Sequence, residues 1–199
     1  MQQRKTCRKF YKELRDNMSQ EQVLAKSEVI CKQVLESAEY RAAKTVLAYY
    51  PLGNEVNCLP VIEQALAEGK QVALPRTGKD CQMDFYEIHS LDDVEEGNFH
   101  VMEPKTNCAE LKPESSYAKE AGNEQRSTST LVLVPGVVFD SVGNRYGFGK
   151  GFYDRYFARF SELTRMALAF TEQISEDALE CLETDVKMHM IVTDKGILT

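Results

Sequence analysis

The segment of the sequence with the clearest chemical potential is a loop in which glycines alternate with cations. From Gly143 to Gly151, four of the chain's 11 glycines alternate with Arg145, Lys150 and aromatic residues. Glycines allow successive backbone N–H groups to converge on an anion, and the helix predicted after them adds partial positive charge. Asp154 follows, where a carboxylate could hold a Mg²⁺ ion that bridges phosphates. We therefore predict a phosphate-binding site here rather than a glycine-rich surface turn.

This loop differs from the two common glycine motifs that bind nucleotides. A Walker A motif has the pattern G-x-x-x-x-G-K-[ST], but the residue after Lys150 is Gly151 rather than Ser or Thr. The G-x-G-x-x-G motif of dinucleotide-binding folds would need a third glycine where Phe152 stands. The residues alone thus indicate an anion site of another type.

The elements that must position the loop form an alternating series of helices and strands. Helices are predicted at residues 3–16, from about Gln20 after a Ser19–Gln22 capping box, at 59–68 and at 153–160. Strands are predicted at 45–50, 71–74, 83–88, 131–134, 166–170 and 190–193. This order indicates an α/β fold with a mostly parallel sheet. Ligands bind beyond the carboxyl ends of such strands, so we expect the chemistry in the loops at 51–55, 75–76 and 135–136.

Length and composition are those of one globular domain. The chain has 199 residues, of which 43% are hydrophobic and 28% charged, enough for a sizeable core. We therefore treat residues 1–199 as a single domain. Residues 105–130 are rich in Ser, Thr, Glu and Lys and have no hydrophobic period, so an exposed loop is predicted there.

Charge and cysteine usage exclude several classes of protein. The formal net charge of −7 argues against a nucleic-acid-binding protein, although it leaves room for a local basic pocket. No run approaches the ~18 apolar residues of a membrane span, and the charged N-terminus does not resemble a signal peptide. The six cysteines have no C-x-x-C spacing, so we expect free, non-catalytic thiols in a cytoplasmic protein that binds no membrane. An organelle transit peptide is the alternative, disfavoured by Glu13, Asp16 and Glu21.

Several segments together resemble the 5-formyltetrahydrofolate cyclo-ligase family, also called 5,10-methenyltetrahydrofolate synthetases. The most specific are Pro135-Gly136, Phe139-Asp140, Gly143-Asn-Arg145 and Gly147-Phe-Gly-Lys-Gly-Phe-Tyr-Asp154. Shorter segments agree in order along nearly the whole chain outside 105–130: Arg4-Lys-Thr-Cys-Arg8, Tyr50-Pro-Leu-Gly-Asn-Glu-Val56, Leu74-Pro-Arg76 and Ala167-Leu-Ala-Phe170. The resemblance implies a three-layer α/β/α sandwich.

The resemblance also implies a reaction. ATP and Mg²⁺ would drive the cyclisation of 5-formyltetrahydrofolate to 5,10-methenyltetrahydrofolate, with release of ADP and phosphate. Phosphorylation of the formyl oxygen would make a leaving group, and attack by N10 would close the ring. Such a transfer needs positioning and charge neutralisation more than covalent help. The expected partners are therefore small molecules, and we expect a monomer.

Roles of individual residues follow from the resemblance as well. The expected catalytic residues are Arg145, Lys150 and Tyr153, and the expected metal ligand is Asp154. The residues expected to bind ATP are Arg4, Lys5, Thr6, Cys7, Arg8, Arg145, Tyr146, Gly147, Phe148, Gly149, Lys150, Gly151, Phe152 and Tyr153. Those expected to bind the folate are Leu52, Glu55, Asn57, Phe148, Gly149, Lys150, Gly151 and Phe152. The family's second metal position holds His189, which as an imidazole is a poor magnesium ligand.

Other interpretations remain open from the residues alone. The basic stretch from Arg4 to Arg8 has the spacing of a solvated helix face. A sugar-phosphate isomerase or related transferase would use the anion loop without ATP. A non-catalytic folate-binding or nucleotide-sensing module would bind without turnover. Release of ADP that depends on 5-formyltetrahydrofolate separates the cyclo-ligase from both alternatives.

Overall fold

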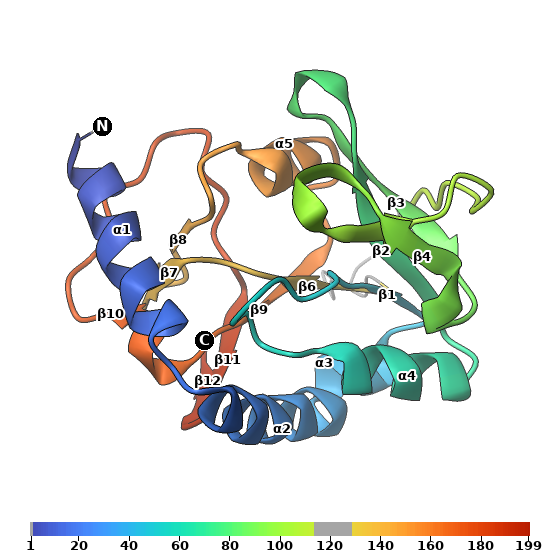
Figure 1. Ribbon diagram of the computed structural model, residues 1–199, viewed down its shortest axis with the longest axis horizontal. Helices are drawn as coiled ribbons and strands as arrows, with labels where there is room; N and C mark the ends of the chain where they lie inside the picture. Colours follow the sequence, from blue (N-terminus) through green and yellow to red (C-terminus); the bar gives the residue numbers. More distant parts are fainter. Residues whose placement is uncertain (1, 114–128) are drawn as a thin grey trace, which may run out of the picture.

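The structure is a computed structural model that describes residues 2–113 and 129–199 (Figure 1). Most of the loop predicted at 105–130 therefore lies outside the described residues. Its first part runs beside strand β3 (Met83–Ile88), because Leu111 N–H donates to the Phe85 carbonyl at 2.8 Å. Glu87 N–H likewise donates to the Ala109 carbonyl at 2.9 Å. Residues 109–111 thus follow the sheet edge before the chain leaves the described part.

The fold is built on a seven-stranded sheet with the order β12-β11-β9-β6-β1-β2-β3. Besides β3, its strands are β1 (Thr45–Leu47), β2 (Gln71–Thr77), β6 (Thr130–Val134), β9 (Thr164–Leu168), β11 (Met190–Thr193) and β12 (Gly196–Leu198). Neighbouring strands are parallel from β2 across to β11, and the two edge strands β3 and β12 are antiparallel to their neighbours. The predicted α/β fold with a mostly parallel sheet is confirmed.

Helices cover both faces of this sheet. Three helices lie on one face, α2 (Gln20–Glu36), α3 (Ala38–Ala42) and α4 (Leu59–Ala67), and α5 (Phe152–Arg159) lies on the other (Figure 1). Successive side chains of a strand point to opposite faces. Val46 accordingly packs in the core under α2 and α4, whereas Leu47 packs in the core under α5. Burial on both faces explains why the central strands β1 and β6 are continuous apolar runs.

Strand β2 is longer than the sequence predicts, because it continues through a proline. Its pairing with β1 ends at Ala73, and beyond this residue β2 pairs with β3 alone. Pro75 therefore lies where the strand has a neighbour on one side only, a position at which sheets tolerate proline. The strand predicted at 45–50 is shorter in the structure and ends as β1 at Leu47.

Several short elements have no signal in the sequence. A second sheet has the order β10-β7-β8, with strands β7 (Val138–Asp140), β8 (Arg145–Tyr146) and β10 (Ile174–Ser175), and a hairpin is formed by β4 (Val94–Glu96) and β5 (Met102–Pro104). One-turn 3-10 helices are η1 (Lys79–Cys81), η2 (Leu91–Asp93), η3 (Asn98–His100) and η4 (Thr171–Gln173). Strands of two or three residues are too short to show a hydrophobic period.

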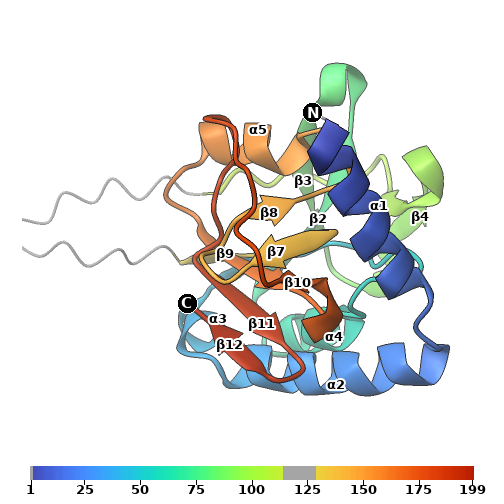
Figure 2. The same ribbon diagram turned by 90° about the vertical axis from the view of Figure 1, so that its left-hand side faces the viewer.

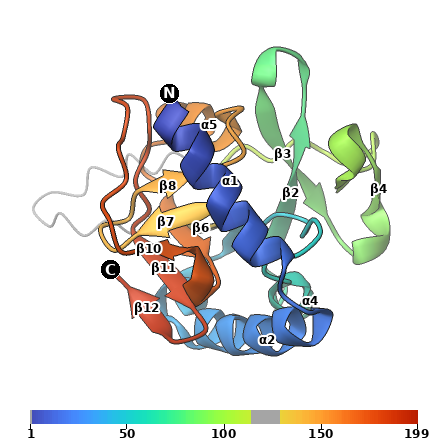
Figure 3. The same ribbon diagram turned by 60° about the vertical axis from the view of Figure 1, so that its left-hand side comes forward.

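The N-terminal helix α1 (Gln2–Asp16) does not cover the large sheet. It lies against the small sheet, beside β7 and β8 in Figure 2 and in front of the ends of these strands in Figure 3. This position brings α1 close to the glycine loop, which follows β8 in the chain. None of the helices in the described part of the chain is long and apolar enough to cross a membrane.

Candidate active site

A cavity of about 930 Å³ lies beyond the carboxyl ends of β1, β2 and β6. Its walls are the loop after β1, the glycine loop between β8 and α5, the first half of α1, the segment that connects β4 to β5, and residues 182–186. Each of the three segments predicted to carry the chemistry contributes to the lining, through Leu52 and Glu55, Pro75, and Pro135. The prediction of a loop at 75–76 is wrong, because these residues belong to strand β2, and Arg76 does not line the cavity. The cavity therefore occupies the position at which parallel sheets bind ligands.

The glycine loop has a backbone that side chains would disturb. Gly149 has a φ of +95°, which residues with a Cβ rarely adopt. A Cβ at Gly147 would lie 2.6 Å from Nη1 of Arg145, so a side chain there would displace the guanidinium. Both glycines line the cavity. The loop therefore offers backbone, rather than side chains, to a ligand.

Arg145 fixes the wall behind this loop. Its side chain is only 4% exposed, and Nη2 lies 3.3 Å from Oδ2 and 3.4 Å from Oδ1 of Asp154. The backbone N–H of Val186 donates to Oδ1 of Asp154 at 3.2 Å. These contacts hold one carboxylate and one guanidinium side by side at the cavity.

Two arginines of α1 also reach the cavity. Nε of Arg8 donates to the carbonyl of Gly147 at 2.8 Å, and Arg4 forms an ion pair of 2.8 Å with Asp185. The guanidinium carbons of Arg4 and Arg8 lie 4.4 and 5.3 Å from the ring centroid of Tyr146. Arg4 and Arg8 are thus packed against the loop and line the cavity, which differs from a solvated helix face.

The other predicted residues of this arm lie elsewhere. Lys5 and Thr6 line a second hollow of about 420 Å³, which shares Arg8 and Phe148 with the main cavity. Cys7 packs against a small cluster that contains Val138, Tyr146 and Leu179, so neither Cys7 nor Tyr146 lines the main cavity. The structure therefore brings the two arginines, but not the residues between them, to the main site.

The loop after β1 supplies Leu52 and Glu55 to the same cavity. Glu55 is buried, and its Oε2 accepts a hydrogen bond from Leu52 N–H at 3.0 Å. Burial raises the pKa of Glu55, while the charge of Arg15 and the Leu52 N–H act in the other direction. Asn57 does not line the cavity, because its backbone N–H donates to Ser27 and its Oδ1 accepts from Leu59 N–H.

The start of α5 adds an aromatic wall between the two loops. Phe148, Lys150, Gly151, Phe152 and Tyr153 all line the cavity. The hydroxyl of Tyr153 is buried and has no hydrogen-bond partner among the described residues. Burial raises the pKa of Tyr153 despite the nearby Arg145 cation, so the phenol stays protonated and can donate a hydrogen bond.

Comparisons with known proteins decide the family. The chain matches the sequence model of the 5-formyltetrahydrofolate cyclo-ligase family over residues 1–194. The chain belongs to this family. It is similar to the probable 5-formyltetrahydrofolate cyclo-ligase of Caenorhabditis elegans, with 29% identity over 192 residues that cover 93% of this chain and 89% of that protein. The mouse 5-formyltetrahydrofolate cyclo-ligase is 28% identical over 186 residues, which cover 89% of this chain and 84% of that protein.

A solved structure agrees with this assignment. The NMR structure of 5,10-methenyltetrahydrofolate synthetase from Aquifex aeolicus matches with a TM-score of 0.81 and 28% sequence identity. The match covers 98% of this chain and 91% of that chain. The predicted family is thus confirmed, and as a member of the cyclo-ligase family the protein is an enzyme.

Some lining residues of this cyclo-ligase family member have no role predicted from the sequence. They are Tyr49, Thr77, Glu103, Arg155, Asp185 and Val186, among others. Glu103 is buried, and its Oε1 accepts hydrogen bonds from the backbone and side chain of Thr77 at 3.0 and 2.7 Å. These residues are far apart in the sequence, and only the fold brings them to one cavity.

The carboxylates at the cavity fit a magnesium ion that keeps its phosphate and water ligands. In residues 2–113 and 129–199 no group of three or more His, Cys, Asp or Glu side chains is arranged to hold a metal. Mg²⁺ typically needs only one or two carboxylates besides phosphate oxygens and water. Asp154 on the cavity wall meets this requirement. His189 does not line the cavity, and its ring contacts Arg165.

All six cysteines are free in the structure, as predicted, and none lines the cavity. Cys31 and Cys58 are buried, and burial raises the pKa of Cys31 to about 11.

We expect a variant with Cys81, Cys108 and Cys181 replaced by serine to keep its activity, with its free energy of unfolding changed by no more than about 1 kcal/mol. The measurement is enzyme activity before and after treatment with a thiol-alkylating reagent. A folded but inactive triple variant would contradict the prediction of non-catalytic thiols.

Proposed function

We propose that this protein catalyses the ATP- and Mg²⁺-dependent cyclisation of 5-formyltetrahydrofolate to 5,10-methenyltetrahydrofolate, with release of ADP and phosphate. The observation that carries the proposal is the pairing of two walls in one cavity. A glycine loop with Arg8, Arg145 and Lys150 suits a polyphosphate, and the loop with Glu55 lines the same cavity. The family membership supports the same reaction.

The reaction proceeds in two stages. The formyl oxygen attacks the γ-phosphorus of ATP, the bond to the β-phosphate oxygen breaks, and ADP leaves. N10 of the folate then attacks the activated formyl carbon and loses its proton, and the carbon–oxygen bond breaks as phosphate departs. The phosphate takes the oxygen that began as the formyl oxygen. A ring with a delocalised N–C–N cation remains.

Residues of this chain position the reactants and neutralise charge. Arg8 and Lys150 bind the phosphates, and Arg145 stabilises the negative charge on the phosphoryl group during transfer. Asp154 would hold Mg²⁺, which supplies charge neutralisation on the phosphate oxygens when bound. The hydroxyl of Tyr153 donates a hydrogen bond to the substrate, since it has no partner among the described residues.

Glu55 is the proposed anchor of the folate. A pterin presents neighbouring N–H groups, and an ionised carboxylate accepts from such a pair with strong, directional hydrogen bonds. Each carboxylate oxygen has two lone pairs, so the bond from Leu52 leaves Glu55 able to accept from a ligand. Leu52 and Phe148 supply apolar surface beside the carboxylate.

One assay tests the proposal. The absorbance of 5,10-methenyltetrahydrofolate is followed with 5-formyltetrahydrofolate, with and without ATP and magnesium, and ADP is quantified in parallel. We expect product and ADP in equal amounts, and neither when ATP or the folate is omitted. Turnover without ATP, or binding of both ligands without turnover, would exclude the proposed reaction.

The cytoplasmic location and the monomeric state also remain predictions. Size-exclusion chromatography with light scattering tests the monomeric state.

Arg8→Ala should weaken ATP binding by about 10- to 100-fold and folate binding much less. The reason is that a charge-assisted phosphate contact is typically worth ~1.5–3 kcal/mol. Calorimetric titration of each substrate measures the two Kd values. Lys9→Ala is the matched control, because Lys9 lies on the same helix with a side chain that is 78% exposed. If Arg8→Ala lowers only the thermal stability, Arg8 has a structural role and the phosphate assignment is wrong.

A further inference from the structure

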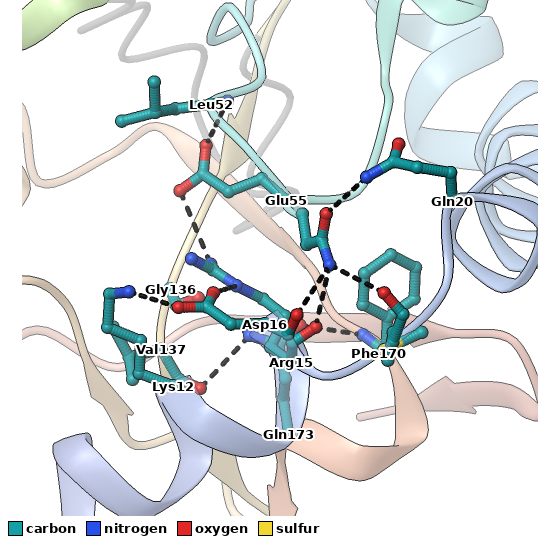
Figure 4. A network of polar contacts seen from close by, with 12 residues as sticks. Lys12, Arg15, Asp16, Gln20, Leu52, Glu55, Gly136, Val137, Phe170 and Gln173 are labelled. Atoms are coloured by element: carbon teal, nitrogen blue, oxygen red, sulfur yellow. Dashed lines mark hydrogen bonds and ion pairs between the residues drawn. The ribbon is translucent and has the colours of Figure 1, made fainter.

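Arg15, in the last turn of α1, is a buried cation that the proposed reaction does not use. Its side chain is 4% exposed, and Nη1 lies 3.7 Å from Oε1 of Glu55. Nε lies 3.7 Å from Oδ1 of Asp16, and neither Nε nor Nη1 of Arg15 has a hydrogen-bond partner among the described residues. Figure 4 shows the guanidinium between the two carboxylates. Burying a charged group costs free energy, so the burial of this guanidinium calls for an explanation beyond the end of a helix, which could leave it in water.

The surroundings of Glu55 explain why a cation is needed there. Besides Arg15, the titratable groups that face this carboxylate are Tyr49, Cys58 and Tyr153, and burial raises the pKa of each. All three are therefore neutral at physiological pH and cannot balance a negative charge. Burial alone would favour the protonated form of Glu55, and the Leu52 N–H and the Arg15 charge oppose it.

The charge of Arg15 is itself shared with α1. Asp16 lies on its other side and is paired with Lys12, one turn earlier in the helix. Asp16 is 42% exposed, whereas the side chain of Glu55 is 7% exposed, so solvent screens the pair with Asp16 more strongly. Arg15 therefore acts mainly on the buried carboxylate.

We propose that Arg15 is a positioning residue that keeps Glu55 ionised and correctly oriented, so that the cavity can bind the N–H edge of the folate. This inference rests on the proposed function, because it assumes that Glu55 anchors the folate. Arg15 does not line the cavity, so it acts through Glu55 rather than on the substrate.

A second contact ties the same residue to the glycine loop. The guanidinium carbon of Arg15 lies 5.6 Å from the ring centroid of Phe148, within the range of a cation–π contact. Phe148 lines the cavity between Gly147 and Gly149. The Arg15 guanidinium thus lies between the loop after β1, which carries Glu55, and the glycine loop. This position limits how far the Glu55 side chain can move.

The test is the pH dependence of 5-formyltetrahydrofolate binding, measured by calorimetry without ATP between about pH 5.5 and about pH 8.5. Loss of an opposite charge at this distance raises the pKa of a carboxyl by roughly 1–3 units. As the pH is lowered, the Arg15→Met variant should therefore lose affinity for 5-formyltetrahydrofolate at a pH at least about one unit above the pH at which the wild type loses it. The loss of affinity should be largest at the acidic end of the range and diminish towards about pH 8.5. Arg15→Lys keeps a charge and should bind with nearly the wild-type pH profile.

Arg76→Met is the matched control. Arg76 is a partly buried arginine that donates to the Pro104 carbonyl and stacks on Tyr86 outside the cavity. Loss of the Arg76 guanidinium should change the free energy of unfolding without moving the pH profile of 5-formyltetrahydrofolate binding. A merely structural role for Arg15 would lower affinity equally at every pH, and parallel profiles for Arg15→Met and the wild type would overturn the inference.

A measurement on the wild type covers the case in which Arg15→Met does not fold. Carbon-13 NMR of glutamate-labelled protein, with Glu55→Gln to assign the resonance, should show the Glu55 carboxyl still ionised at about pH 6.5. Titration of this carboxyl above that pH would overturn the inference. Failure of the wild type to bind 5-formyltetrahydrofolate at any pH would overturn the proposed function and this inference with it. If the wild type is active and the pH profile of folate binding is the same in Arg15→Met, this inference is overturned and the proposed function stands.

Discussion

Asp154→Asn should lower kcat by roughly 100-fold and raise the magnesium concentration needed for half-maximal activity. The substitution keeps the shape of the side chain but removes the charge that pairs with Arg145 and that would hold the metal. Val186 N–H can still donate to the amide oxygen, so the local fold should survive. The activity that remains would depend on phosphate oxygens and water to hold Mg²⁺.

A magnesium titration at saturating ATP measures this effect. His189→Ala is the control, because the family resemblance predicts a second metal position at His189, whereas this residue lies outside the cavity beside Arg165. We expect its magnesium curve to overlie that of the wild type. A larger shift for His189→Ala than for Asp154→Asn would mean that the metal site is assigned to the wrong residue.

Gly149→Val should reduce ATP binding by about 10- to 100-fold while the protein remains folded. The cause is the backbone rather than a lack of space, since a Cβ at Gly149 would lie 3.8 Å from the guanidinium of Arg8, an ordinary contact. At a φ of +95° a β-branched residue is strained by roughly 1–3 kcal/mol, so the loop would leave this conformation. The backbone N–H groups would then no longer converge on the phosphates.

The control for Gly149→Val is Gly69→Val. Gly69 has a φ of +73°, a Cβ added to it would meet nothing within 4 Å, and it follows α4 away from the cavity lining. Valine at this position therefore imposes a similar backbone strain without touching the loop. Gly69→Val should lower the melting temperature and leave the ATP Kd unchanged. If both variants bind ATP normally, the glycine loop is not the phosphate site.

The sequence predicts six of the seven strands of the large sheet, because each contains several apolar residues in succession or in alternation, whereas the three-residue edge strand β12 was not predicted. Leu131 to Val134 is the clearest case, and it forms the centre of the sheet as β6. The small sheet could not be predicted, since β8 is two residues long and is held by pairing with β7 rather than by its own pattern. Local propensity is too weak to define such elements.

The candidate site was predictable where its signal is local. Glycine density and the adjacent cations indicate the phosphate loop directly, and the structure places Arg145, Lys150 and Asp154 at the cavity. Arg15 and Asp185 could not be found in this way. Arg15 is paired with Glu55, 40 positions later, and Asp185 is paired with Arg4 near the start of the chain. Contacts over such distances depend on the tertiary fold alone.

The position of α1 has a consequence for translation and for cloning. Met18 follows α1, so a polypeptide begun at this methionine would retain every strand of the large sheet and α2 to α5. It would lack Arg4 and Arg8, and with them one wall of the cavity, as well as Arg15 beside Glu55. Such a shortened product would keep the remaining secondary structure, and a far-ultraviolet spectrum would show only the loss of the 15 helical residues of α1. That spectrum does not report on the cavity wall, so a choice of start codon has to be judged by ATP binding as well.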